Sequence, residues 1–151
     1  MKQNDLLIGL MREEDVHQIA QIEQECFSLP WSENCVRSEL TNPLSIWLTA
    51  RLDDLVVGYI GSQTVLGEAD IMNVAVDRQH RRRGIGKALL LELERMLKEK
   101  DVYSMTLEVR ASNEPAISLY DMLGYSVIGR RPNYYQRPKE DALILRKEWE
   151  I

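Results

Sequence analysis

The chain has 151 residues, of which 44% are hydrophobic and 28% are charged, and its formal net charge is −5. This balance is typical of a globular protein and argues against extensive disorder. The acidic total argues against a general nucleic-acid-binding protein, which needs a basic face. No apolar run in the sequence approaches the roughly 18 residues of a membrane span, so we expect no membrane association.

The organisation of the chain is expected to be simple. Residues 1–151 contain no repeat, linker or low-complexity tract, so we expect one domain with one core. The N-terminal segment lacks the apolar stretch of a signal peptide, which predicts a cytoplasmic protein. Cys26 and Cys35 are not spaced as a disulfide framework, and His17 and His80 have no companions at metal-ligand spacing. We therefore expect neither a disulfide nor a metal site.

Hydrophobic periodicity and turn residues predict the elements of the first half of the chain. Strands are expected over 6–11, 45–51, 56–65 and from the turn at Gly67 and Glu68 to Val76. Helices are expected over 13–27 and from Ser32, as the capping residue, to about Leu40.

The second half of the chain begins with a long amphipathic helix, predicted over 84–100. A strand over 104–110 follows, and the next helix has Asn113 as its cap, Pro115 in its first turn and Gly124 as its C-terminal glycine. The last two strands are expected over 125–130 and 142–146. The order β-α-α-β-β-β-α-β-α-β-β predicts an α/β (α+β) fold, a mixed sheet with helices on both faces.

The most informative segment lies between the strand that ends at Val76 and the long helix. It combines basic residues with two glycines: Arg81, Arg82, Arg83, Gly84, Ile85, Gly86 and Lys87. The first backbone N–H groups of a helix lack partners and, together with the helix dipole, attract anions. Glycine lets an anion approach the backbone closely. The segment therefore predicts a phosphate site, preferably for a diphosphate, although a solvated basic turn that caps a surface helix is the alternative from these residues alone.

Two common glycine loops do not fit this segment. A Walker loop requires Ser or Thr after the lysine, where the chain has Ala88. A dinucleotide fingerprint requires a third glycine, where the chain has Leu89. The spacing of Arg81, Gly84 and Gly86 instead resembles the coenzyme A pyrophosphate loop of the Gcn5-related N-acetyltransferase (GNAT) superfamily.

A second group of candidate residues follows the long helix. Glu108 is a charged residue within an apolar strand, so it either points to solvent or lines a cleft where a carboxylate could act as a base. Tyr120, on the following helix, is either a core residue or a phenolic proton donor. Asn113 is a good helix cap whatever else it does.

The sequence from Leu107 to Asn113, followed by Leu119, Tyr120 and Gly124, resembles the branch of the GNAT superfamily that acetylates N-terminal amines. Within that branch it resembles above all the bacterial ribosomal-protein alanine N-acetyltransferases, the RimI type. The similarity extends over nearly the whole chain, and it is carried also by separated segments at 29–32, 73–77, 133–135 and 140–142. Between Tyr135 and Glu140 the chain is shorter than some members of the family.

The resemblance implies the GNAT fold, with a central, mixed, mostly antiparallel seven-stranded sheet, four helices on both faces and a splayed cofactor cleft between the fourth and fifth strands. It implies acetyl-CoA as cosubstrate, with no metal. The pyrophosphate would lie on the backbone from Arg82 to Lys87, and Asn113 would contact the pantetheine arm. The pantetheine would pair with the backbone of the strand before the loop, at Val74, Ala75 and Val76. We would assign the polarisation of the thioester carbonyl to the Val74 N–H.

The resemblance also implies the chemistry and the acceptor. Glu108 would be the base and Tyr120 the acid in direct acyl transfer to an α-amine. Trp31, Tyr134 and Tyr135, which we expect in loops, would flank the path of the incoming peptide. The implied acceptor is the N-terminal alanine of a small-subunit ribosomal protein, and the enzyme would be a monomer or weak dimer.

Three alternatives remain open at this stage. An acetyltransferase of the same fold could act on other protein N-termini or on a small amine. A nucleic-acid-binding module could use the basic segment from Arg78 to Lys87, without consuming a thioester. A non-catalytic protein could bind coenzyme A and dock on a partner.

Overall fold

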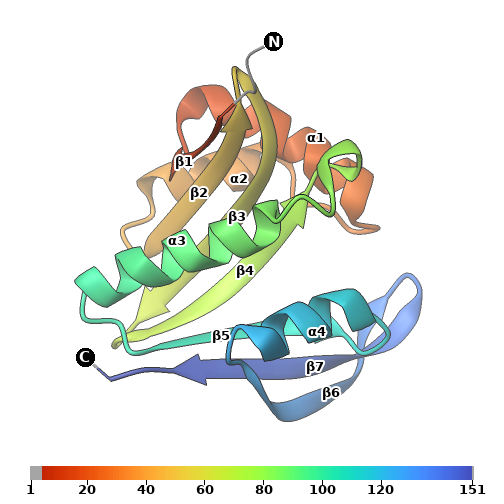
Figure 1. The fold of residues 1–151 in the computed structure, drawn as a ribbon. Coiled ribbons are helices and arrows are strands. Elements are labelled where there is room, and N and C mark those ends of the chain that lie inside the picture. The colour runs from red at the N-terminus through yellow and green to blue at the C-terminus, as the bar shows by residue number, and fades with distance from the viewer. Residues whose placement is uncertain (1–4, 151) are drawn as a thin grey trace.

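The protein is described by a computed structural model over residues 5–150, and these residues form one seven-stranded sheet in the order β1-β2-β3-β4-β5-β7-β6 (Figure 1). Every neighbouring pair is antiparallel except β4 and β5, which run parallel. The strands are β1 (Leu6–Leu10), β2 (Ser45–Leu52), β3 (Leu55–Val65), β4 (Glu68–Val76), β5 (Ser104–Arg110), β6 (Ser126–Gln136) and β7 (Lys139–Glu148). The predicted mixed, mostly antiparallel sheet is confirmed.

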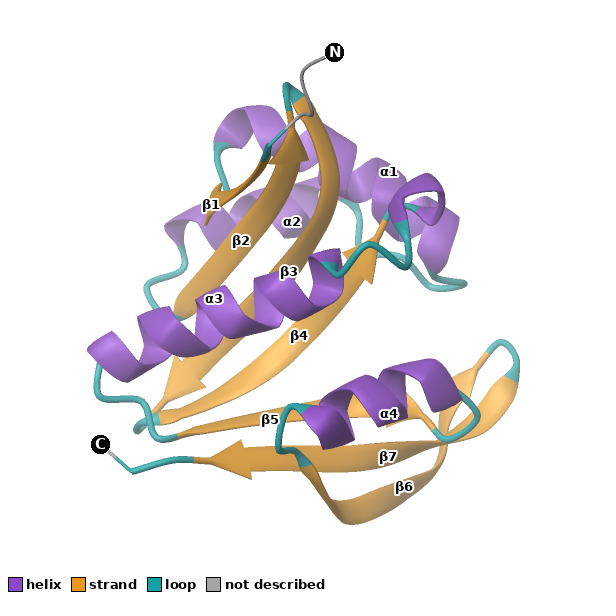
Figure 2. Ribbon diagram, in the orientation of Figure 1, coloured by secondary structure: helices purple, strands orange, loops and turns teal. Residues whose placement is uncertain are grey.

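Helices cover both faces of this sheet (Figure 2). They are α1 (Val16–Cys26), α2 (Glu33–Ser38), α3 (Ile85–Glu99) and α4 (Glu114–Met122), and short 3₁₀ turns occupy Glu13–Asp15, Glu39–Thr41 and Arg78–His80. The helices α3 and α4 lie on one face, and α1 and α2 lie on the other. No helix within residues 5–150 is long and apolar enough to cross a membrane.

Two hydrophobic clusters hold the helices to the sheet. On the first face, α3 buries Leu89, Leu93 and Leu97, the stripe that its periodicity predicts. On the second face, α1 buries Val16 and Ile19 in a cluster that also contains Trp47 and Tyr59 of the sheet. The second cluster is centred on β2 and β3, and farther along the same side of the sheet β5 presents the polar residues Thr106, Glu108 and Arg110.

The strands β4 and β5 are paired at one end and diverge toward the other. Their parallel pairing includes only three residue pairs, from Glu68–Ser104 to Asp70–Thr106, although β4 continues to Val76 and β5 to Arg110. Figure 1 shows the two ribbons diverging beyond that point. The predicted separation of the fourth and fifth strands is confirmed, and it leaves one edge of β4 without a strand partner.

The hairpin of β6 and β7 is longer than the sequence predicts. The prediction that Tyr134 and Tyr135 lie in a loop is wrong, because both belong to β6. The strand continues past residue 130, where the sequence predicts its end, and accommodates Pro132 and Asn133 in a register shift between Arg131 and Tyr135, with Asn133 at φ 55°. The Asn133 N–H donates to Asp141 of β7 at 2.8 Å, which fixes this bulge.

Candidate active site

The open edge of β4 offers its backbone to an extended ligand. The Asp77 N–H donates to the Val57 carbonyl of β3, whereas the Val76 carbonyl points the other way and accepts from Arg81. Backbone groups alternate in direction along a strand, so the N–H and C=O of Val74 point to the same open side as those of Val76. Ala75 is 91% buried and paired with β3, and it contributes mainly to the core.

A bulge immediately precedes this open segment. Gly61 of β3 pairs with Asn73, while the next residue, Ser62, pairs with Ile71, so Met72 has no partner on β3. A bulge of this kind bends the strand and increases its twist. The bulge at Met72 lies two residues beyond Asp70, the last residue of β4 that pairs with β5.

The loop between β4 and α3 has the conformation of an anion site. Arg82 and Gly84 have positive φ angles of 65° and 77°, and Gly84 is the N-cap residue of α3. Left-handed residues next to a helix N-terminus turn successive N–H groups toward a common point. Ile85 is 97% buried, so only its backbone can serve a ligand. Gly86 has open space around it, with Val76 as its nearest side chain.

The basic side chains of the loop differ in what they do. Arg82, Arg83 and Lys87 are exposed, and none of them makes an ion pair with another described residue. Arg81 is engaged: its Nε donates to the Val76 carbonyl at 3.1 Å, and its Nη2 lies 3.2 Å from Cys26 Sγ. Arg81, one of the four basic residues that the sequence places around the anion, thus also ties the loop to the end of β4 and to α1.

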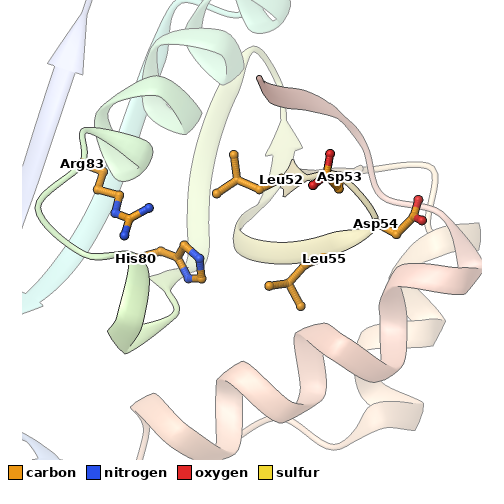
Figure 3. A pocket seen from close by; sticks show the side chains of 6 residues that line it. All are labelled: Leu52, Asp53, Asp54, Leu55, His80 and Arg83. Atoms are coloured by element: carbon orange, nitrogen blue, oxygen red, sulfur yellow. The ribbon is translucent and has the colours of Figure 1, made fainter. Parts of the chain in front are cut away.

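An open hollow of about 520 Å³ lies beside this loop (Figure 3). His80 and Arg83 line it from the loop, and the turn between β2 and β3 contributes its other wall, which is made by Leu52, Asp53, Asp54 and Leu55. Two carboxylates in one wall disfavour a phosphate there. The backbone of the loop therefore suits an anion better than this hollow does.

Glu108 lies on β5 two residues beyond its last pairing with β4. Its neighbours Leu107 and Val109 are buried in the core, so its side chain points to the opposite face, where it is 25% exposed. Its Oε1 lies 3.3 Å from Arg131 Nε, whereas its Oε2 is buried and has no hydrogen-bond partner among residues 5–150. A buried acceptor without a donor is uncommon in proteins. The carboxylate is thus neither a solvated surface group nor a fully satisfied core group, and it can accept one more proton donor.

A second carboxylate increases the negative potential near Glu108. Burial raises the pKa of Asp70, and the charges of Glu108 and Glu68 raise it further. Asp70 lies at the end of the paired part of β4, where the two strands begin to separate. This potential favours a cationic group, such as a protonated amine, over an anion.

The two tyrosines of β6 lie near the same carboxylate. The approach of Glu108 raises the pKa of Tyr134, with burial as a second cause, and burial followed by Glu108 raises the pKa of Tyr135 to about 12. Their rings meet edge to face at 5.1 Å, and Arg110 lies 4.4 Å above the Tyr135 ring. The structure thus brings Glu108, Tyr134 and Tyr135 together.

Tyr120 lies deeper than the other candidates. It is 6% exposed, and its ring packs edge to face against Tyr125 at 5.6 Å. Burial, with a smaller effect of Tyr135, raises the pKa of Tyr120 to about 12. Its phenol therefore stays protonated at neutral pH. Asn113 is exposed and caps α4, accepting from the Ala116 N–H at 3.3 Å.

Trp31 is held from two sides. Its ring centroid lies 5.4 Å from that of Trp47, and its backbone N–H donates to Glu23 Oε1 at 3.0 Å. It remains half-buried, so part of the ring is available to a ligand. The sequence analysis did not identify Glu23 as a partner of Trp31. Its position on the otherwise apolar face of α1 was the feature that could have indicated a buried, hydrogen-bonded carboxylate.

Within the described residues, no group of three or more His, Cys, Asp or Glu side chains is arranged to hold a metal ion.

The profile of the Acetyltransferase (GNAT) family matches residues 16–125. The chain belongs to this family. It is an acyltransferase with the GNAT fold, as the pattern of the loop at Arg81, Gly84 and Gly86 predicts.

Individual relatives agree with this assignment. A [ribosomal protein bS18]-alanine N-acetyltransferase from Salmonella typhimurium is 39% identical over 141 residues, which cover 91% of this chain and 94% of the relative. The crystal structure of the ribosomal-protein-S18-alanine N-acetyltransferase from Escherichia coli has a TM-score of 0.90 at 33% identity, covering 97% of this chain and 96% of that one. Ard1 from Thermoplasma volcanium shares the fold, with a TM-score of 0.88 at 24% identity over 97% of this chain and 99% of its own. The GNAT enzyme is thus similar along its whole length to proteins of the RimI type.

Proposed function

We propose that the protein transfers the acetyl group of acetyl-CoA to the free N-terminal α-amine of a protein, and that the acceptor is the N-terminal alanine of a small-subunit ribosomal protein. The names of the relatives from Salmonella typhimurium and Escherichia coli support this acceptor. The observation that carries the proposal is the opening between β4 and β5, which is bordered by an unpaired backbone edge and by the unpartnered Oε2 of Glu108. In this proposal residues 1–151 act as one N-acetyltransferase domain in the cytoplasm.

The donor is held by backbone groups. The N–H groups from Arg82 to Lys87 bind the pyrophosphate of acetyl-CoA, and the exposed basic side chains of this loop add long-range attraction. The pantetheine arm pairs with the open edge of β4 at Val74, Ala75 and Val76, in the manner of an added strand. The Val74 N–H then donates to the thioester carbonyl and stabilises the oxyanion that forms there. Asn113 borders the arm from the start of α4.

Glu108 acts on the acceptor. An α-ammonium group has a pKa of about 7.7–8.0, so part of it is already deprotonated near neutral pH and loss of its proton toward solvent costs little. Glu108 accepts that proton, directly or through a water, and passes it on. The free amine attacks the carbonyl carbon, a C–N bond forms, and the tetrahedral intermediate collapses as its C–S bond breaks. The proton taken by Glu108 passes to solvent, so the carboxylate is ready for another turnover.

Tyr120 acts on the leaving group. A phenol whose pKa is about 12 is a weaker acid than a thiol, whose pKa is about 8.5. A complete transfer from Tyr120 to the departing thiolate is therefore unfavourable unless the phenol recovers a proton in the same step. The ammonium nitrogen of the intermediate can supply that proton, so Tyr120 relays it from nitrogen to sulfur. Neither cysteine takes part.

The acceptor wall favours a cationic peptide N-terminus. Glu108 and Asp70 supply negative potential, and Trp31, Tyr134 and Tyr135 supply aromatic surface on either side of the incoming amine. Such a wall suits an N-terminus that carries arginine and aromatic side chains behind its first residue.

The proposal is tested by incubating the protein with acetyl-CoA and peptides that begin with Ala, Ser, Met or Gly, or with small amines, while thiol release and product mass are followed. We expect acetylation of the α-amine, fastest for a peptide that begins Ala-Arg. Acetylation of small amines alone would contradict the acceptor. Binding of coenzyme A with no acetylation of any amine would contradict the enzymatic function.

A further inference from the structure

Glu23 is a buried carboxylate that the mechanism above does not use. It lies on α1 with no exposed surface, and three groups donate to it: the Trp31 N–H at 3.0 Å, the Asn73 side-chain amide at 2.8 and 2.9 Å, and the Tyr59 hydroxyl. The donors come from three different parts of the chain, namely the segment between α1 and α2, β4, and β3. One carboxylate therefore connects three pieces of structure that are remote in sequence.

The chemistry of the donors requires an acceptor at this point. A backbone N–H and a primary amide nitrogen can only donate, so both Trp31 and Asn73 need an oxygen between them. Burial raises the pKa of Glu23, while its three hydrogen bonds lower it. Removal of the carboxylate would leave these donors buried without partners, which is the costly way to break a network.

Two of the donors, Asn73 and Trp31, belong to segments with different roles in the proposed function. Asn73 follows the bulged residue Met72 and directly precedes Val74, on the open edge of β4. Trp31 lies between α1 and α2, in the segment that the proposed function assigns to the acceptor peptide. The Glu23 carboxylate thus lies between the strand proposed to hold the thioester and the segment proposed to hold the peptide.

Aromatic packing makes this connection rigid. The ring centroid of Trp47 lies 5.4 Å from that of Trp31 and 5.9 Å from that of Tyr59. The Tyr59 hydroxyl in turn donates a hydrogen bond to Glu23. A Cβ atom at Gly61 would lie 2.3 Å from the Trp47 ring, so the ring lies flat on β3 at the residue that pairs with Asn73. The segment that carries Trp31 is therefore fixed to the sheet beside the bulge.

We propose that Glu23 is a positioning residue for the acceptor: it fixes the Trp31 segment relative to Val74, and so sets the distance between the incoming amine and the thioester. This inference rests on the proposed function. Glu23 touches neither substrate, and it acts through Trp31 and Asn73. Because the phosphate loop lies outside this network, and the network reaches the pantetheine strand only through Asn73, the binding of coenzyme A should depend on Glu23 weakly.

The first test compares Glu23→Ala with Glu23→Gln. A glutamine carbonyl can still accept from Trp31 and Asn73, and its amide can donate to the Tyr59 oxygen, so the network survives in large part. We expect Glu23→Ala to raise the KM for an Ala-Arg peptide by about tenfold and to lower kcat by about tenfold, since small errors of placement reduce rates strongly. The Kd for coenzyme A should change by less than about twofold, and Glu23→Gln should recover most of both kinetic losses.

Glu39 provides a matched control. It is also a buried carboxylate, 7% exposed, with three side-chain donors in Asn42, Ser45 and Gln63. These partners lie away from Trp31 and Val74, in the Glu39–Thr41 turn region and on β2 and β3. Glu39→Ala should lower stability to a similar extent without changing the KM for the peptide. Equal kinetic losses in Glu23→Ala and Glu39→Ala would overturn the inference, as would wild-type kinetics in Glu23→Ala.

Two further measurements separate this inference from the proposed function. If Glu23→Ala fails to fold, Asn73→Ala removes the link to β4 alone. It should lower kcat severalfold while coenzyme A still binds, and an unchanged kcat would overturn the inference. If the wild type acetylates no peptide, the proposed function fails, and amide exchange at Trp31 then tests the positioning role. Faster exchange in Glu23→Ala but not in Glu39→Ala would support it, and equal exchange would refute it.

Discussion

The donor and acceptor sides of the site are built in different ways. The donor side is one continuous segment, from Val74 at the open edge of β4 to Lys87 in the first turn of α3. Its features are backbone features: an unpaired strand edge, left-handed residues and a helix N-terminus. The acceptor side is assembled from side chains of α1, β4, β5 and β6, together with the segment between α1 and α2. Binding of a ligand through backbone groups survives many side-chain substitutions. Binding of an acceptor through side chains from several elements is weakened by the loss of any one of them.

The acceptor side should be the more sensitive of the two, and Glu108→Gln is the sharpest way to break it. We expect turnover to fall by about 100-fold or more, because general bases contribute about that much, while the Kd for coenzyme A stays unchanged. Steady-state kinetics and calorimetric titration measure the two quantities. Glu68→Gln, an exposed carboxylate that pairs with Arg146, is the control and should keep its turnover. An intact rate in Glu108→Gln across the pH range would remove Glu108 from the mechanism.

The same contrast governs what could be predicted from the sequence. The order of elements was accessible because it follows from local periodicity and turn residues, and the separation of β4 from β5 was accessible through the resemblance to the GNAT superfamily. The extension of β6 through Asn133 was not accessible, because a hydrogen bond to Asp141 on β7 overrides the local turn preference. The role of Arg81 as a tie to Val76 and Cys26 was equally hidden, since those contacts join residues from three elements.

The pH profile of turnover should report on the acceptor amine and on Tyr120. The acceptor amine gains reactivity as it deprotonates, so kcat/KM should rise from pH 6 and level off near about pH 8. Burial raises the pKa of Tyr120 to about 12, so the protonated phenol persists across this range and no fall is expected up to about pH 10. Tyr120→Phe should lower kcat by about tenfold or more over the whole plateau.

Tyr125→Phe is the matched control, because it removes a hydroxyl from the neighbouring ring and should leave the plateau unchanged. A fall in the wild-type rate well below pH 10, or an unaltered Tyr120→Phe, would contradict this assignment.

The donor side is best probed at a glycine. Gly84 has φ 77°, where an L-residue costs roughly 1–2 kcal/mol, so Gly84→Ala should lower stability by about that amount. It should also raise the KM for acetyl-CoA severalfold by shifting the N–H groups at the start of α3. Thermal unfolding and the KM for acetyl-CoA measure the two effects. Gly9→Ala, on β1, where an added methyl meets nothing within 4 Å, is the control and should change neither, and an equal effect of the two substitutions would show that the backbone conformation is not the cause.

The smallest effect is expected from the exposed charges of the loop. Replacement of Arg82 and Arg83 together by Gln should weaken coenzyme A binding by about two- to fivefold at low salt and by less at high salt, because exposed charges are screened. Titrations at two ionic strengths measure the difference. A loss of more than about 100-fold that persists at high salt would mean that these side chains, and not the backbone, hold the phosphates.

The placement of the acetyl donor beside residue 108 is tested most directly by a crystal structure of Glu108→Gln with acetyl-CoA bound. The account predicts that the pyrophosphate accepts from backbone N–H groups between Arg82 and Lys87, and that the thioester carbonyl accepts from Val74 with its carbon open toward residue 108. A pyrophosphate in the hollow between His80 and the turn at Asp53, or a thioester directed away from residue 108, would contradict it.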